Sequence, residues 1–179
     1  MYININPYFN ALCTIKLSHT FNQRHKKLHN VPIKWQNILI NDGSFTRNLK
    51  ALTGQNIDIK LLQKSYKQKS QLLRSNRKVF LYAKNYPYIT FARSLCVLEN
   101  VNRQNNIVYT NKPIGQSIIE SNIDIHKKIY EIYCGYSNEL ENIFKSSKLI
   151  WGRKYKLYYE AKSYLIIQEF FSPHLINLI

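Results

Sequence analysis

The sequence predicts an α+β fold in which a mainly antiparallel β-sheet is covered by short helices. Its 179 residues suit one domain that is large enough to enclose a ligand. Most apolar segments alternate apolar and polar residues, as strands do, and they come in pairs joined by short turns. The segments with helical spacing are short and lie between these strands. Hairpins with intervening helices are typical of an antiparallel sheet with helices packed on it.

The pattern of apolar and polar residues in the N-terminal part of the chain changes at Trp35. Residues 1–34 have no clean period, and we expect a loosely patterned lead-in to a single domain over residues 35–179. The short apolar segment 35–40 is followed by a polar run at 41–44 that is typical of a turn. The last residue of that run, Ser44, can cap a helix, and Gly54 is placed to end it.

The middle of the chain predicts three strands. Residues 57–62 alternate and predict the first of them. Residues 63–76 are polar and basic, and we expect a loop with some helix there. Residues 77–83 and 88–98 predict a hairpin with a turn between them.

The C-terminal part predicts a second hairpin. The segment Pro113-Ile114-Gly115 leads into an expected short helix that ends near Ser121. Residues 123–134 predict a strand, and residues 137–144 predict a helix. Two further strands, at 151–159 and 164–171, predict the hairpin, which Ser172-Pro173 ends.

The chain is strongly basic, with a formal net charge of +16, and this alone favours a nucleic-acid partner. However, Asn, Ile, Lys and Tyr are all abundant, and A/T-rich codons favour these four residues. The lysines are scattered through every segment instead of forming a stripe beside exposed aromatic residues. We therefore expect no nucleic-acid partner, and two explanations of the charge stay open: codon bias, or a positive surface that steers an anionic ligand inward.

Several other classes of protein are not favoured by the sequence. A run of about 18 apolar residues is missing, so we expect no membrane insertion. The N-terminus resembles neither a signal peptide nor a transit peptide. The three cysteines are far apart without a CxxC motif, so we expect no metal. GxGxxG and Walker motifs are also missing, and no cofactor is implied.

Two charged residues stand on strand faces that are otherwise apolar. Alternation places Glu169 beside Ile167 and Arg77 beside Val79. If buried, the carboxylate must be paired or protonated, and the guanidinium needs an anion. The two residues therefore form either a structural salt bridge or two sides of a cavity. In a cavity, a ligand would bring a carboxylate to Arg77 and a hydroxyl to Glu169.

Three other motifs leave their roles open. Asp42-Gly43-Ser44 does not match the GxSxG nucleophile elbow, so we interpret Ser44 as a helix cap. Trp151-Gly152-Arg153 is either a binding turn or the start of a strand with Arg153 paired locally. Gly115 is a lone glycine without the neighbours of a phosphate loop.

A family resemblance is carried by seven segments that occur in a fixed order. They are residues 40–47 (INDGSFTR), 77–81 (RKVFL), 88–94 (YITFARS), 113–115 (PIG), 132–137 (IYCGYS), 151–153 (WGR) and 168–173 (QEFFSP). Together they resemble the chorismate pyruvate-lyase family over roughly residues 35–175. The resemblance is strongest to the branch found in cyanobacteria and encoded in algal plastid genomes.

The resemblance implies a chorismate lyase-like fold, an antiparallel sheet with packed helices that encloses a ligand cavity. It implies removal of pyruvate from chorismate to leave 4-hydroxybenzoate, without a metal or a cofactor. The catalytic roles fall on Arg77, which binds a carboxylate, and Glu169, which contacts the hydroxyl. Further substrate-binding positions are Ser44, Phe45, Thr46, Gly115 and Arg153, the first three through backbone N–H groups around the ring carboxylate.

The resemblance also implies a place and leaves other functions open. It implies a protein that is encoded in the plastid genome and works in the stroma, where 4-hydroxybenzoate feeds plastoquinone synthesis. One alternative is a catalytically silent module of the same fold that binds a small aromatic acid. The other is a basic organellar protein that associates with RNA.

Overall fold

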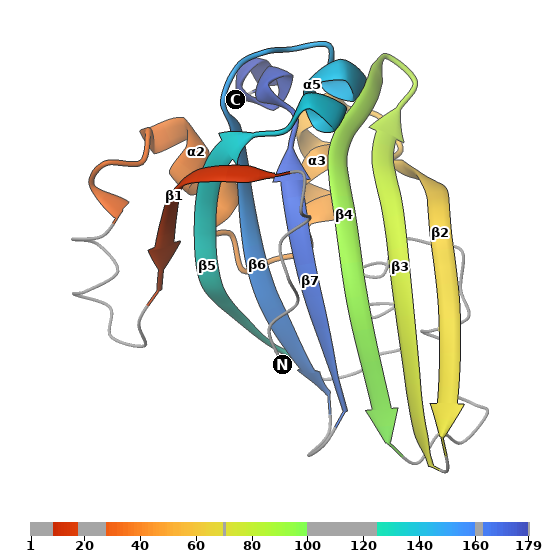
Figure 1. The fold of residues 1–179 in the computed structure, drawn as a ribbon. Helices are drawn as coiled ribbons and strands as arrows, with labels where there is room; N and C mark the ends of the chain where they lie inside the picture. The colour runs from red at the N-terminus through yellow and green to blue at the C-terminus, as the bar shows by residue number, and fades with distance from the viewer. Residues whose placement is uncertain (1–8, 18–27, 70, 100–124, 160–162, 179) are drawn as a thin grey trace.

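The computed structural model describes residues 9–17, 28–69, 71–99, 125–159 and 163–178 (Figure 1). These residues form one seven-stranded antiparallel sheet with a few short helices, which confirms the α+β prediction. In chain order, the elements are β1 (Asn10–Lys16), α2 (Ile33–Leu39), α3 (Phe45–Thr53), β2 (Asp58–Lys69), β3 (Leu72–Ala83), β4 (Tyr86–Glu99), β5 (His126–Tyr136), α5 (Asn138–Phe144), β6 (Ile150–Tyr159), β7 (Ser163–Phe171) and the 3₁₀ helix η2 (Pro173–Leu178).

The sheet order is β1-β5-β6-β7-β4-β3-β2 (Figure 1). Both predicted hairpins are present, as β3–β4 and as β6–β7. The two hairpins meet at the centre of the sheet, where β4 pairs with β7. This pairing brings Arg77, in the first hairpin, and Glu169, in the second, onto neighbouring parts of one sheet.

The helix predicted after Ser44 is α3, and its end follows the expected chemistry. Gly54 has the left-handed backbone conformation, with φ of 65°, and its N–H donates to the carbonyl of Lys50. At the other end, Ser44 occupies the N-cap position, but its side chain makes no capping hydrogen bond. The predicted capping role of the Ser44 hydroxyl is therefore wrong, although the helix begins where expected.

The polar stretch at residues 63–76 was expected to be a loop with some helix, and this prediction is wrong. The segment belongs to β2 and β3, which pair with each other from Asp58↔Tyr82 to Lys69↔Leu72. Strand β2 lies at the edge of the sheet and nearly all its side chains are exposed, so its second half, residues 63–69, carries no apolar alternation to reveal a strand, unlike the first half, which was predicted. In this part of β3 only Leu73 and Ser75 precede Arg77 as buried residues.

Parts of the predicted N-terminal lead-in, residues 1–34, pack against the rest of the molecule. β1 pairs antiparallel with β5 and forms one edge of the sheet. Leu28 and Val31 belong to the buried core. The expected short helix around residues 113–121, with Gly115, lies outside the described residues.

The two faces of the sheet bury different kinds of side chain. We call the face covered by α2 and α3 the cavity face; there, Trp35, Leu39 and Leu49 of the helices pack on β5, β6 and β7. On the opposite face, α5 packs over an aromatic cluster, which we define as Phe9, Phe80, Phe91, Tyr133, Phe144 and Phe170. In Figure 1, α2 and α3 lie behind the sheet and α5 lies at its upper end.

Candidate functional site

A cavity of about 220 Å³ lies between the cavity face and the start of α3. This volume suits a ligand smaller than a typical drug molecule. The walls come from the turn before α3 and from all strands except β1. The lining residues are Asp42, Gly43, Ser44, Phe45, Thr46, Ile59, Arg77, Val79, Leu81, Ala92, Ser94, Ile125, Lys127, Tyr155, Leu157, Ile167 and Glu169.

Most of the predicted site residues line the cavity. Arg77 and Glu169 both line it, from β3 and β7, and Ser44, Phe45 and Thr46 line it from the start of α3. Arg153 does not line it, and Gly115 lies outside the described residues. Segments far apart in the sequence therefore converge on one hollow.

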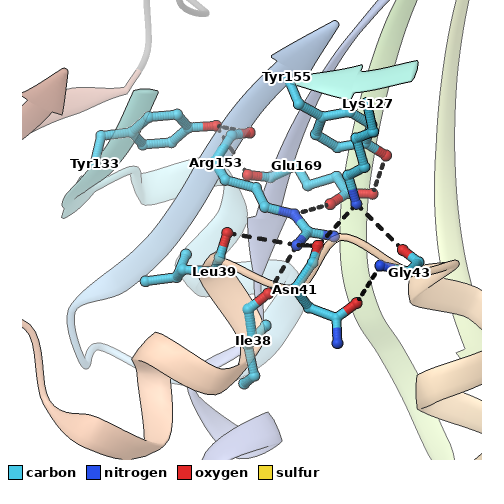
Figure 2. Close-up of polar contacts among 9 residues, drawn as sticks. All are labelled: Ile38, Leu39, Asn41, Gly43, Lys127, Tyr133, Arg153, Tyr155 and Glu169. Atoms are coloured by element: carbon cyan, nitrogen blue, oxygen red, sulfur yellow. Dashed lines mark hydrogen bonds and ion pairs between the residues drawn. The ribbon is translucent and has the colours of Figure 1, made fainter. Parts of the chain in front are cut away.

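Glu169 lies on the cavity face, as the alternation of side chains along β7 predicts. The side chain is buried, and both carboxylate oxygens accept hydrogen bonds (Figure 2). Oε2 accepts from Nε of Arg153 at 2.7 Å, in an ion pair, and Oε1 accepts from the hydroxyl of Tyr155 at 2.9 Å. Each carboxylate oxygen has a second lone pair, so Glu169 can still accept a bond from a ligand.

The ion-pair partner of Glu169 is Arg153 and not Arg77. Arg153 on β6 stands directly opposite Glu169 on β7 in the sheet register. By contrast, Arg77 is two strands away and offset by two residues, since β4 lies between β3 and β7. At about 4.8 Å per strand and about 3.4 Å per residue, the two Cα atoms are roughly 12 Å apart. The ion pair that the structure shows for Glu169 is thus the one with Arg153, directly across the sheet.

Arg153 is completely buried, and it holds α2 against the sheet. Its Nη1 donates to the carbonyl oxygens of Ile38 at 2.8 Å and Asn41 at 3.1 Å (Figure 2). Carbonyls at the C-terminal end of a helix have no intrahelical partner, so a cation is favoured there. Its guanidinium also lies over the rings of Phe45 and Tyr155, at 5.1 and 5.2 Å from their centroids. Arg153 thus fixes both Glu169 and the turn that forms one cavity wall.

Lys127 on β5 brings a second cation to the cavity, and the sequence analysis missed it. Its Nζ donates to the carbonyl oxygens of Asn41 at 2.9 Å and Gly43 at 3.2 Å, and it lies 4.5 Å from the centroid of the Tyr155 ring (Figure 2). Burial lowers the pKa of Lys127 to about 8, assisted by the charge of Arg153 and opposed by Glu169 and Asp42. A signal was available, because alternation puts Lys127 on the same face as Ile125 and Ile129.

Arg77 lies on the other side of the cavity, with Val79 and Leu81 along the same strand. It is buried, and desolvation lowers the pKa of its guanidinium, an effect that a Coulombic interaction with the Tyr66 phenol opposes only in part. An arginine keeps its charge despite such a shift, since its ordinary pKa is far above neutrality. The cavity therefore has a permanent cation on this side.

The start of α3 supplies polar backbone to the same hollow. The first N–H groups of a helix have no intrahelical partner, and they attract anions. Phe45 and Thr46 carry such groups and line the cavity. The turn before them is fixed by a hydrogen bond at 2.8 Å from the N–H of Gly43 to Oδ1 of Asn41. In the described part of the chain, Oγ of Ser44 is buried without a hydrogen-bond partner.

Tyr155 was also missed at the level of sequence, where it was not among the predicted site residues. Burial raises the pKa of Tyr155 well above its usual value, and the charge of Glu169 adds to the increase. Its hydroxyl therefore stays protonated and remains a donor to Glu169. Tyr155 lines the cavity beneath Lys127, so it belongs to the site.

The structure also reports on metals and membranes within the described ranges. There, no three His, Cys, Asp or Glu side chains gather into a group that could hold a metal ion. In the same ranges, every helix is too short or too polar to cross a membrane.

Comparison with known proteins gives a family match over most of the chain. Residues 39–179 match the family described as chorismate pyruvate-lyase Rv2949c-like. This range contains every residue that lines the cavity and the ion pair beneath it.

Relatives with the name ycf21 cover most of the chain as well. The protein from Antithamnion sp. is 44% identical over 149 residues, which is 83% of each chain. The proteins from Porphyra purpurea and Pyropia yezoensis are 38% and 34% identical over 150 residues, or 82% of this chain and 85% of theirs. The ycf names denote genes of plastid genomes, which supports plastid encoding of this chain.

Proposed function

The chain belongs to the chorismate pyruvate-lyase Rv2949c-like family, and we propose that it converts chorismate to 4-hydroxybenzoate and pyruvate. The observation that carries this proposal is the arrangement of charge in the cavity. Arg77 and Glu169 line one small hollow from strands that are two apart, and the start of α3 faces the same space. A ring acid with a hydroxyl opposite its carboxylate fits between a cation and a hydrogen-bond acceptor placed in this way.

The ring carboxylate of chorismate binds to Arg77 in this proposal. A guanidinium offers two parallel N–H donors to a carboxylate, and such bidentate bonds are stronger than neutral ones. The backbone N–H groups of Phe45 and Thr46 add donors at the start of α3. The apolar side chains of Val79 and Leu81 flank the ring.

Glu169 meets the ring hydroxyl. Its position is held by Arg153 and Tyr155, so the carboxylate is oriented before the ligand binds. Arg153 acts in this proposal as a positioning residue, because it is buried beneath the cavity and contacts Glu169 and not the ligand.

The reaction needs orientation more than a strong nucleophile. The ring loses the proton from the carbon that bears the hydroxyl, and the ether C–O bond at the next carbon breaks. The electron pair of that bond leaves with the enolpyruvate oxygen, and the enolpyruvate takes a proton at its methylene carbon to become pyruvate. Formation of the aromatic ring drives the step, so the protein has to position the groups and assist the proton transfer.

We further propose that the protein works in the plastid stroma. There, 4-hydroxybenzoate would serve as a ring precursor for plastoquinone. The plastid naming of the relatives supports this location.

The experiment that tests the function is turnover of chorismate by the purified protein. We expect release of 4-hydroxybenzoate and pyruvate in equal amounts, measured by chromatography and by a coupled lactate dehydrogenase assay. Arg77→Ala should lower kcat/KM by about 100-fold or more, since it removes a bidentate charged contact. The matched control is Arg74→Ala, which removes an exposed arginine from the same strand.

Other outcomes would reassign the protein. Tight binding of 4-hydroxybenzoate without turnover would make it a binding module of the same fold. Neither turnover nor binding, together with tight and salt-sensitive RNA binding, would remove the cavity from the functional account.

A further inference from the structure

Lys127 is a cation in the cavity wall that takes no part in the reaction proposed above. Its ammonium group is held at the cavity wall by two neutral carbonyl oxygens and an aromatic ring. Burial of an ammonium group is costly, and a lysine that served only to tie the turn to the sheet would not need to face a cavity. The placement therefore indicates an anionic ligand group beside it.

The bonds of Lys127 leave room for such a group. An ammonium has three N–H donors, and the carbonyls of Asn41 and Gly43 account for two of them. Within the described residues, the nearby carboxylate of Glu169 pairs with Arg153 and Tyr155, and it forms no ion pair with Lys127. The remaining donor and most of the positive charge are thus available to a ligand.

The charge of the substrate matches the charges of the cavity. Chorismate carries two carboxylates, one on the ring and one on the enolpyruvyl ether. The ether stands on the ring carbon next to the one that bears the hydroxyl. If Glu169 meets that hydroxyl, the second carboxylate lies on the same side of the cavity, and Lys127 is the cation placed there (Figure 2).

We infer that Lys127 binds the enolpyruvyl carboxylate and so selects ligands with two carboxylates over ligands with one. This inference rests on the proposed function, because it assigns a residue to the second half of the same substrate. Arg77 then determines the affinity for any aromatic acid, and Lys127 determines the preference for the substrate over 4-hydroxybenzoate. A cavity arranged in this way weakens its hold on the aromatic product once pyruvate has been cleaved.

Two ligands distinguish the role of Lys127 from that of Arg77. One is 4-hydroxybenzoate, with one carboxylate; the other is 3-(1-carboxyvinyloxy)-4-hydroxybenzoate, an unreactive aromatic analogue with both. Isothermal titration gives the dissociation constant of each for the wild type, for Lys127→Met and for Lys128→Met. Lys128 is the matched control, because it is the next residue of β5 and points to the other face of the sheet.

Lys127→Met should weaken binding of the two-carboxylate analogue by about 10- to 100-fold, the range for a hydrogen bond between charged groups. Its affinity for 4-hydroxybenzoate should stay within about threefold of the wild type. Lys128→Met should leave both affinities unchanged, and Lys127→Arg should restore most of the preference for two carboxylates. The same loss for both ligands, or for neither, would overturn the inference.

A measurement on the wild type covers the case in which Lys127→Met fails to fold. The preference for two carboxylates should fall as the pH rises through about 8, where Lys127 loses its proton. The charged and titratable groups that face Lys127 are Arg153, Asp42, Glu169 and Tyr155, and burial raises the pKa of Tyr155 well above its usual value, so its hydroxyl stays protonated. A preference that is constant from pH 7 to pH 9 would contradict the inference. The two ligands share the phenol, whose own titration cancels in the ratio.

Turnover distinguishes this inference from the proposed function. If the wild type binds the two-carboxylate analogue through Lys127 but does not cleave chorismate, the lyase proposal fails and the role of Lys127 stands. If the wild type cleaves chorismate and Lys127→Met does so with unchanged kcat/KM, the lyase proposal stands and the role of Lys127 fails. If neither ligand binds the wild type, both fail.

Discussion

The two faces of the sheet bury their side chains by different means. In the aromatic cluster, rings contact rings: the centroid of Phe170 lies 4.9 Å from that of Phe9 and 5.3 Å from that of Tyr133. On the cavity face, Arg153 and Glu169 are buried just as deeply, but they are held by hydrogen bonds with fixed directions. Packed rings fill the space between them, whereas a bonded network can surround a hollow. On the cavity face, the buried Glu169 accordingly lines the hollow, with Arg153 holding it from behind.

Tyr133 connects the two faces through Gly152. Its ring belongs to the aromatic cluster, yet its hydroxyl donates to the backbone carbonyls of Glu169 at 2.8 Å and Arg153 at 3.2 Å. The ring can approach this closely only because residue 152 is a glycine. A Cβ there would clash with the Tyr133 ring and with the Glu169 carbonyl. The backbone that carries the ion pair is thereby fixed from the opposite face.

The largest effect should come from breaking the bonded network at Arg153. Arg153→Met keeps much of the volume but leaves Glu169 buried without its cation, and it removes the donor to the carbonyls of Ile38 and Asn41. We expect the free energy of unfolding, measured in urea, to fall by about 3–5 kcal/mol. Arg47→Met, at an exposed site on α3, should change it by less than about 0.5 kcal/mol. A small loss in Arg153→Met would show that the network is not the main support of the cavity face.

The aromatic cluster offers the opposite test, a large loss of stability without a loss of binding. Phe170 is completely buried and contacts Phe9, Phe91 and Tyr133. Phe170→Ala should lower the free energy of unfolding by about 3–4 kcal/mol, because it leaves a cavity among the rings. The dissociation constant of 4-hydroxybenzoate for the folded protein should stay within about threefold of the wild type. If affinity fell as far as in Arg77→Ala, the two faces could not be treated as separate in function.

Much of the fold could be predicted from the sequence, because alternation survives wherever one face of a strand is buried. In strand β7, both faces of which are buried, the two-residue period of side chains still placed Glu169 on the same face as Ile167, which is the cavity face. The second half of strand β2, residues 63–69, is the opposite case, since water reaches nearly all its side chains and no pattern distinguishes it from a loop. The helix end predicted at Gly54 is present, because the left-handed conformation there depends only on the backbone of the glycine itself.

The site could be predicted only in part, because pairing across the sheet is not written in either strand alone. Both Arg77 and Arg153 stood out as candidates to meet an anion, and only the register of β6 against β7 selects Arg153 as the partner of Glu169. Lys127 is further from prediction, because its role depends on the carbonyls of a turn 84 and 86 residues earlier in the chain. A pattern within one strand can give the face of a residue, but not what lies across from it.

The smallest effect should come from Tyr155→Phe, which removes one hydrogen bond from the network and leaves the ring in place. Glu169 keeps Arg153 on Oε2 but loses the donor to Oε1, so the free energy of unfolding should fall by about 1–2 kcal/mol. Lys127 keeps its contact with the aromatic ring, because that contact does not involve the hydroxyl. Glu169 would be less well oriented toward the ring hydroxyl, and kcat/KM for chorismate should fall by about tenfold with little change in the preference for two carboxylates.

The control for this change is Tyr158→Phe, at an exposed position on the other face of β6, which should leave stability and kcat/KM unchanged. A Tyr155→Phe protein with normal kcat/KM would mean that Arg153 alone orients Glu169. A protein that lost the preference for two carboxylates would mean instead that Tyr155 and Lys127 act as one unit. The size of the loss in kcat/KM therefore measures how much the orientation of Glu169 depends on Tyr155 and how much on Arg153.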